Sequence, residues 1–218
     1  MSSYIRQLIG GGESQVLDFK FEISDSRKIA RTLSAFANTG GGTLLVGVKD
    51  NGRIAGVRSE EEFYMLEAAA QLYCKPEVDF SVKEWHIDGK TILEAKIAKS
   101  NAPPHYARSG DGKWLAYVRV DDENILANNI MIRVWKRRGR PTGTLIRYSD
   151  KEKILFDYLK EHETISLSMF QRLANTNFYR AATILVNLIV LDLISVTFRD
   201  KQIVYSLGNH HIQKSGLR

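Results

Sequence analysis

The chain has 218 residues, 44% of them hydrophobic, and a formal net charge of +6, with a pI near 9.3. Four prolines are too few for a linker-rich disordered protein. The single cysteine, Cys74, excludes a disulfide scaffold and fits the reducing cytoplasm. No signal-peptide core opens the sequence, and the most apolar run, residues 184–196, is too short to span a membrane. We therefore expect a soluble cytoplasmic protein whose basicity suits a polyanionic partner without requiring one.

Residues 1–138 predict a mixed α+β domain. Alternating apolar and charged side chains over residues 16–23 predict a strand. The stretch over residues 24–42 predicts a helix with both of its ends marked. Ser24, Asp25 or Ser26 is the expected N-cap, and Gly40 is expected just past the last helical residue. The other expected elements, in chain order, are strand 43–50, an Asn51–Gly52 turn into a further strand, helix 60–73, strands 78–87 and 91–99 joined at Asp88–Gly89, strand 113–120 and helix 123–138.

A basic linker is predicted over residues 139–147, where arginines alternate with Gly and Pro. Residues 148–218 then predict a small winged-helix domain with a disordered tail. Its expected elements are helices 149–163, 166–175 and 176–191 and a β-hairpin over 193–207 that turns at Asp200–Lys201. The expected fold class is therefore α+β followed by a helix-turn-helix unit.

The glycines of the stretch NTGGG, residues 38–42, do not predict a nucleotide loop. They follow a helix and enter a strand, whereas a phosphate cradle precedes a helix N-terminus. The chain contains no G-x-x-x-x-G-K-[ST] and no complete G-x-G-x-x-G. A helix end with close backbone packing is the favoured interpretation, and ATP use is not supported.

Three stretches together carry a family resemblance: GESQVLDFK at 12–20, SAFANTGGGTLLVGVKDNGRIAGV at 34–57 and PPHYARSGDGKWLAYVRV at 103–120. With these blocks, residues 10–135 resemble the Schlafen AlbA-type domain, which is described as a DNA-binding module. Prokaryotic members often carry a C-terminal winged helix and are commonly regarded as transcriptional regulators. The resemblance therefore implies the same domain order that the helix and strand pattern predicts.

The same resemblance implies an alternative, because some Schlafen domains are metal-dependent endoribonucleases that act on tRNA and rRNA. Carried over by position, their acidic trio becomes Glu13, Asp18 and, at the third place, Lys49 or Asp50. Carboxylates there would hold Mg²⁺ or Mn²⁺, and Lys20 would neutralise charge in the transition state. Two departures weaken this alternative: Asp18 replaces the usual glutamate, and Lys49 replaces an aspartate, so only Asp50 can supply the third ligand.

Basic residues interleaved with aromatic ones predict a nucleic-acid surface on the first domain. The basic candidates are Lys20, Arg27, Lys28, Arg31, Arg108, Lys113 and Arg119, and the aromatic residues among the later ones are His105, Tyr106, Trp114 and Tyr117. A core position for Trp114 and simple solvent exposure of the helix cations are the competing interpretations.

In the second domain the third helix is expected to enter the major groove. Asn177, Arg180 and Thr183 are its candidate base contacts, and Arg199 and Lys201 at the wing tip are candidate phosphate contacts.

The sequence thus favours a nucleic-acid-binding protein, namely a regulator that binds double-stranded DNA as a homodimer and has no obligatory cofactor. The alternatives are the metal-dependent endoribonuclease and a protein-interaction scaffold that dimerises through its winged helix.

Overall fold

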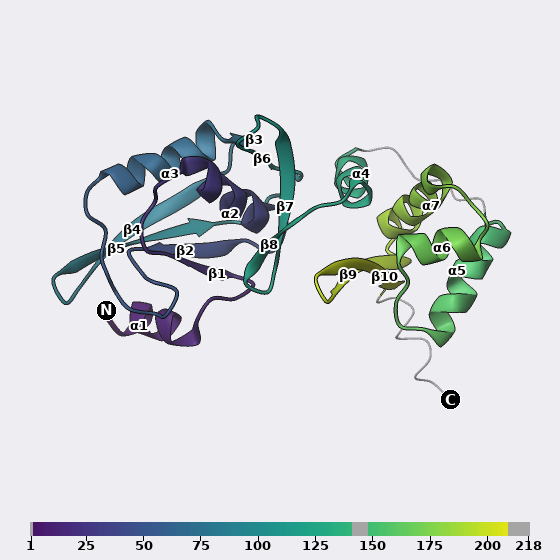
Figure 1. Ribbon diagram of the computed structural model, residues 1–218, viewed down its shortest axis with the longest axis horizontal. Coiled ribbons are helices and arrows are strands. Elements are labelled where there is room, and N and C mark those ends of the chain that lie inside the picture. Colours follow the sequence, from purple (N-terminus) through teal and green to yellow (C-terminus); the bar gives the residue numbers. More distant parts are fainter. Residues whose placement is uncertain (1, 141–147, 209–218) are drawn as a thin grey trace. The chain divides into compact units, whose positions relative to one another are not determined.

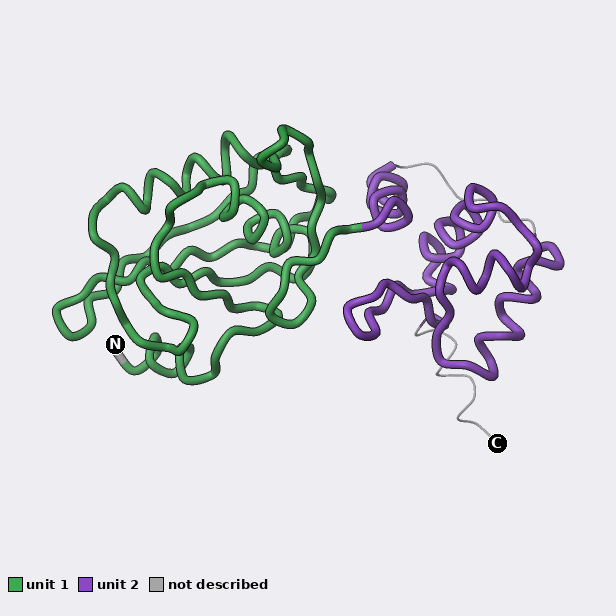
Figure 2. The backbone as a smooth tube through the Cα atoms, viewed as in Figure 1, with its two compact units in different colours: residues 1–127 green, residues 128–218 purple. Residues whose placement is uncertain are grey.

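A computed structural model describes residues 2–140 and 148–208 (Figure 1). The chain divides into two compact units, residues 1–127 and 128–218 (Figure 2). The predicted mixed α+β class is confirmed by the helices and sheets of these units. Most of the predicted linker and the predicted disordered tail fall on residues 141–147 and 209–218, which lie outside the described residues.

The first unit is built on a four-stranded sheet with the order β1-β2-β5-β4. β1 and β2 run parallel, whereas β5 is antiparallel to both of its neighbours. The parallel pair arises because a helix crosses over between the two strands. The strands are β1 (Leu17–Lys20), β2 (Gly42–Val46), β4 (Phe80–Ile87) and β5 (Lys90–Ile97).

Helices cover both faces of this sheet. α2 (Ser26–Asn38) and α3 (Glu61–Gln71) lie on one face, and the short α1 (Ser2–Gly11) lies on the other (Figure 1). Asp25 is the N-cap of α2, since its carboxylate accepts from the N–H of Arg27. Apolar residues at helical spacing on α2 are fully buried against the sheet, as their period of 3.6 requires.

A second sheet of order β3-β6-β7-β8 packs beside α2. Its strands are β3 (Cys74–Lys75), β6 (Tyr106–Arg108), β7 (Trp114–Val120) and β8 (Glu123–Leu126). The prediction of a helix from residue 123 is wrong for this first segment. Residues 123–126 pair antiparallel with residues 117–120 of β7 around a turn at Asp121, whose φ is 53°.

The second unit contains four helices and a β-hairpin in its described residues. They are α4 (Asn129–Arg138), α5 (Asp150–Glu161), α6 (Leu167–Leu173), α7 (Phe178–Val190), β9 (Ile194–Arg199) and β10 (Gln202–Leu207). Side-chain caps begin all four of these helices: Asn128, Ser149 with Glu152 in a capping box, Ser166, and Asn177.

The position of α4 differs from the predicted boundary after residue 138. Ile130 and Val134 of α4 are 1% and 4% exposed and belong to the same hydrophobic core as α5, α6 and α7. Burial of these two side chains therefore places α4 in the second unit, and the division falls at residues 127–128.

Candidate functional site

Charged side chains that the sequence singles out meet on β1. Asp18 and Lys20 lie two residues apart on this strand and therefore share a face. One carboxylate oxygen of Asp18 is 3.0 Å from Nη2 of Arg119, which comes from β7. The other lies 2.9 Å from Nζ of Lys20, an ion pair that lacks hydrogen-bond geometry. The side chains of Asp18 and Arg119 are only 5% and 1% exposed, so this is a buried ion pair.

The guanidinium of Arg119 connects four parts of the first unit. Besides Asp18, it donates to the backbone carbonyls of Ser14 and Leu17 and to the side-chain oxygen of Asn124 on β8. The amide of Asn124 donates in turn to the hydroxyl of Thr32 on α2. This hydrogen-bonded network joins β1, β7, β8 and α2, and it leaves the guanidinium no exposed surface for a ligand.

The same side chains also satisfy the free edge of β1. Apart from an isolated bridge between Leu17 and Ser14, β1 pairs only with β2 in the described residues, so the rest of its other edge needs partners for its backbone groups. A carboxylate oxygen of Glu13 accepts from the N–H of Phe19 at 2.8 Å, and Lys20 donates to the carbonyl of Phe19 at 2.7 Å. Arg119 donates to the carbonyl of Leu17. Side chains thus replace the missing neighbouring strand.

Burial raises the pKa of Glu13, and the neighbouring Asp18 carboxylate raises it further. The N–H of Phe19 and the charge of Lys20 act in the opposite direction but do not cancel the effect. Glu13 is therefore less readily ionised than an ordinary glutamate.

The predicted metal trio is not assembled. Glu13 and Asp18 interact, but Asp50 lies exposed in the turn after β2, where the adjacent Lys49 ammonium sits 5.0 Å from the centre of the Phe21 ring. Across residues 2–140 and 148–208, no three His, Cys, Asp or Glu side chains are placed to hold a metal ion. Both oxygens of Asp18 already face cations. These residues therefore do not fit Mg²⁺ or Mn²⁺, and we derive no catalytic step from them.

The cations predicted to form a surface on the first unit divide into two groups. Arg119 is 2% exposed and is not part of that surface, which corrects the prediction made from the interleaved basic and aromatic residues. The exposed members are Arg27, Lys28, Arg31, Arg108 and Lys113, while Lys20 is half-buried. Of the aromatic residues interleaved with them, His105 is buried, with its ring nitrogens bonded to the carbonyl of Pro76 and the hydroxyl of Ser100.

In the second unit, the first turn of α7 is exposed. Asn177 caps the helix by accepting from the N–H of Arg180, and the Arg180 side chain faces solvent. Phe178 and Tyr179 are 45% and 79% exposed, which is unusual for aromatic residues. The sequence prediction did not single out Phe178. Two adjacent aromatic residues at the start of a helix point in different directions, so their position directly after the cap could have indicated that at least one ring is exposed.

Farther along α7, arginines of α4 contact the outer face. Thr183 donates to the carbonyl of Tyr179 and accepts from Arg133, and Asn187 is hydrogen-bonded by Arg137. The hydroxyl of Thr183, a predicted base contact, is thus already in use. The arginines of α4 are functional candidates that the sequence placed in the wrong domain.

Arg199 and Lys201 lie exposed at the hairpin tip, where Asp200 and Lys201 have φ angles of 49° and 62°.

The two units carry opposite net charges. Residues 128–218 contain 15 Lys and Arg against 7 Asp and Glu, a net charge of +8, whereas residues 1–127 contain 16 against 18, a net charge of −2. The basicity of the chain is therefore a property of its second unit.

The chain is similar to parts of solved structures at low sequence identity. No curated protein matches this sequence. Among solved structures, the DIP2311 protein from Corynebacterium diphtheriae is 22% identical with a TM-score of 0.45; the match covers 62% of this chain but only 29% of that one. The N-terminal domain of a RecG-related protein from Nitrosomonas europaea is 21% identical with a TM-score of 0.39, over 49% of this chain and 81% of that domain.

No helix in the described part of the chain is long and apolar enough to cross a membrane. The family model for the Schlafen AlbA_2 domain matches residues 13–128, which are more than half of the chain and nearly all of the first unit. The chain therefore belongs to the Schlafen AlbA_2 family.

Proposed function

We propose that this protein binds double-stranded DNA through its second unit and acts as a regulator of transcription. The observation that carries the proposal is the net charge of +8 on residues 128–218 beside −2 on the rest of the chain. Phosphate neutralisation by Lys and Arg supplies most of the non-specific affinity of DNA-binding proteins, so the basic unit is the one expected to contact the duplex.

The arrangement of the second unit supports a winged-helix interpretation. Three helices, α5 to α7, precede the hairpin β9–β10, and Ile165 before α6 forms an isolated bridge to Tyr205 of β10. In such a unit the last helix enters the major groove with its N-terminal residues, and the hairpin contacts the backbone. Arg180 then reads bases, and Arg199 and Lys201 contact phosphates.

The contacts of α4 sharpen this proposal. Because Arg133 and Arg137 occupy Thr183 and Asn187, the later turns of α7 have no free polar side chain on that side. Base contacts are therefore expected from the first turn alone, chiefly from Arg180 and the exposed Tyr179. A short contact of this kind gives modest specificity per subunit, which a symmetric homodimer on a palindromic site would double.

Fluorescence anisotropy with the full chain and a labelled 20-base-pair duplex tests the proposal. We expect affinity to fall steeply as salt rises and Arg180→Gln to weaken binding about tenfold. Lys160→Gln is the matched control, because Lys160 is an exposed cation of α5 whose charge is paired with Asp157 at 2.8 Å. The absence of binding at low salt, or equal losses in the two variants, would contradict the proposal.

A further inference from the structure

Two adjacent aromatic side chains are exposed at the start of α7. Phe178 and Tyr179 are 45% and 79% exposed, and their rings meet edge to face with centroids 5.8 Å apart. Tyr179 is the most exposed large hydrophobic residue of the described structure. Because removal of apolar rings from water is favourable, an exposed pair of this kind indicates a surface that contacts another molecule.

A similar pair on the first unit differs in its electrostatic surroundings. Phe63 and Tyr64 of α3 also meet edge to face, with centroids 5.9 Å apart, and Tyr64 is 60% exposed. The first turn of α3 contains Glu61 and Glu62, whereas the first turn of α7 has no acidic residue. The units that carry the two pairs have net charges of −2 and +8. The pair on α7 is therefore the one suited to a polyanionic partner.

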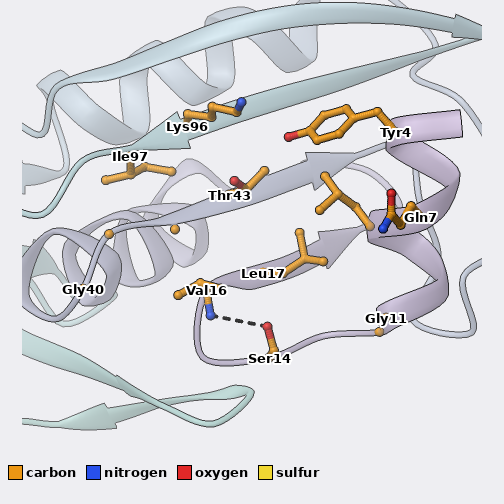
Figure 3. Close-up of a pocket in the computed structure, with 14 residues that line it drawn as sticks. Tyr4, Gln7, Gly11, Ser14, Val16, Leu17, Gly40, Thr43, Lys96 and Ile97 are labelled. Carbon is orange, nitrogen blue, oxygen red and sulfur yellow. Dashed lines mark hydrogen bonds between the residues drawn. The ribbon is translucent and has the colours of Figure 1, made fainter. Parts of the chain in front are cut away.

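An open cleft of about 760 Å³ between α1 and the start of β2 is a further concave surface of the first unit (Figure 3). Lys96 is the charged residue that lines it, and its ammonium lies 3.3 Å from a carboxylate oxygen of the buried Glu94. Since that carboxylate balances the charge of Lys96, the cleft attracts an anion less strongly than the start of α7 does.

The first turn is also the part of α7 that can approach a duplex. Seven of the 13 residues of this helix are buried, all of them from Ala181 onward. The Cα–Cβ bonds of a helix tilt toward its N-terminus, so the side chains of residues 178–180 project toward whatever the helix end faces. With that end in the major groove, Tyr179 and Arg180 reach neighbouring base pairs.

We propose that the ring of Tyr179 covers the methyl group of a thymine in the major groove, beside the base that Arg180 reads. The C5 methyl of thymine is the apolar group on the major-groove edges, and adenine, guanine and cytosine lack it. Ring and methyl both lose contact with water when they meet, which favours thymine at that position. The contact needs the ring and not the hydroxyl of Tyr179. This inference rests on the duplex-binding function proposed above and adds the base that the first turn prefers.

Deoxyuridine, which differs from thymidine by this methyl group alone, tests the contact. The probe is a duplex that the full wild-type chain selects from a pool with random central sequences, and its thymines are replaced one at a time by deoxyuridine. We expect one of these replacements to weaken binding of the wild type about three- to tenfold in fluorescence anisotropy, as the loss of one buried methyl group predicts.

Three variants assign the effect to the ring. Tyr179→Ala should bind the thymine duplex about three- to tenfold more weakly than the wild type and should no longer distinguish it from the deoxyuridine duplex. Tyr179→Phe should keep the difference, because it keeps the ring. Tyr64→Ala is the matched control, since it removes an exposed ring of the same kind from the acidic unit, and it should behave as the wild type does. Tyr179 and Tyr64 are exposed, so all three variants should fold.

The outcomes separate this inference from the proposed function. If the wild type binds the selected duplex but tolerates deoxyuridine at every position, only the thymine contact is refuted. Persistence of the deoxyuridine effect in Tyr179→Ala would refute it as well, and dissociation of a dimer by that variant in sedimentation velocity would then assign the ring pair to a contact between two copies of the chain. Failure of the wild type to select any duplex would remove both proposals.

Discussion

The buried pair of Asp18 and Arg119 allows a quantitative test of its structural role. Replacing Arg119 by Met keeps much of the side-chain volume but removes a guanidinium that makes hydrogen bonds of 3.0–3.3 Å to four acceptors. Asp18 would then be a buried carboxylate with Lys20 as its remaining ion-pair partner. Breaking a buried pair by removal of one partner costs about 3–5 kcal/mol, which is a large part of the stability of an ordinary domain.

Urea unfolding followed by tryptophan fluorescence measures this loss. A Trp135→Phe background confines the signal to Trp85 and Trp114, which both belong to the first unit. With a slope of about 2 kcal/mol per M, the expected loss moves the unfolding midpoint of Arg119→Met down by roughly 2 M. Adding Asp18→Asn should recover part of the loss, because the second change removes the unpaired charge, and a coupling of about 1–3 kcal/mol is expected.

Lys113→Met is the control for the loss of a basic residue from an ion pair. Lys113 and Asp111 are 2.7 Å apart, but their side chains are 73% and 55% exposed, so solvent screens the interaction and little change is expected. If Arg119→Met were as stable as this control, the network on β1 would not have the structural role that its geometry assigns to it.

Three further substitutions test other parts of the structure. Burial opposes ionisation of Glu94, but hydrogen bonds from Tyr4, Trp85 and Lys96 outweigh it and lower the pKa of Glu94 below 4.5. The stability that this group contributes is therefore present above pH 4.5 and is lost as the pH falls through its folded-state pKa. Because Glu94→Gln removes the titrating group, this variant should show a smaller difference between its urea unfolding midpoints at pH 7 and pH 4 than the wild type does. Asn177→Ala should lower the stability of α7 by about 1 kcal/mol, measured by amide hydrogen exchange, whereas Asn177→Asp should retain it. Gly42→Ala should cost about 1–3 kcal/mol in thermal unfolding because the new Cβ meets the Phe36 ring, while Gly40→Ala should be close to neutral.

Local patterns in the sequence predicted the elements whose signals are themselves local. The apolar spacing and a cap among Ser24, Asp25 and Ser26 predicted α2, and the structure selects Asp25 as the cap. Asp88–Gly89, with φ angles of 51° and 72°, formed the expected tight turn between β4 and β5. In these places the backbone preference of one or two residues agrees with the fold, so sequence alone was sufficient.

The features that sequence did not predict depend on distant partners. Residues 123–126 have a helix-compatible composition but become β8 because the edge of β7 accepts them. Arg119 is buried because Asp18, 101 positions earlier in the chain, lies beside it. No periodicity within a strand records such a partner. The family resemblance implied, as an alternative, a metal site at Glu13, Asp18 and Asp50, whereas Glu13, Lys20 and Arg119 instead bond the backbone at the free edge of β1.

The charge division between the units predicts a steep dependence of duplex binding on salt. The second unit has a net charge of +8 and would neutralise several phosphates at once, whereas the first unit has a net charge of −2. A plot of log affinity against log salt for the full chain and the duplex should therefore have a steep negative slope, because the slope grows with the number of phosphates neutralised. A slope near zero would mean that the basic unit does not hold the duplex through its phosphates.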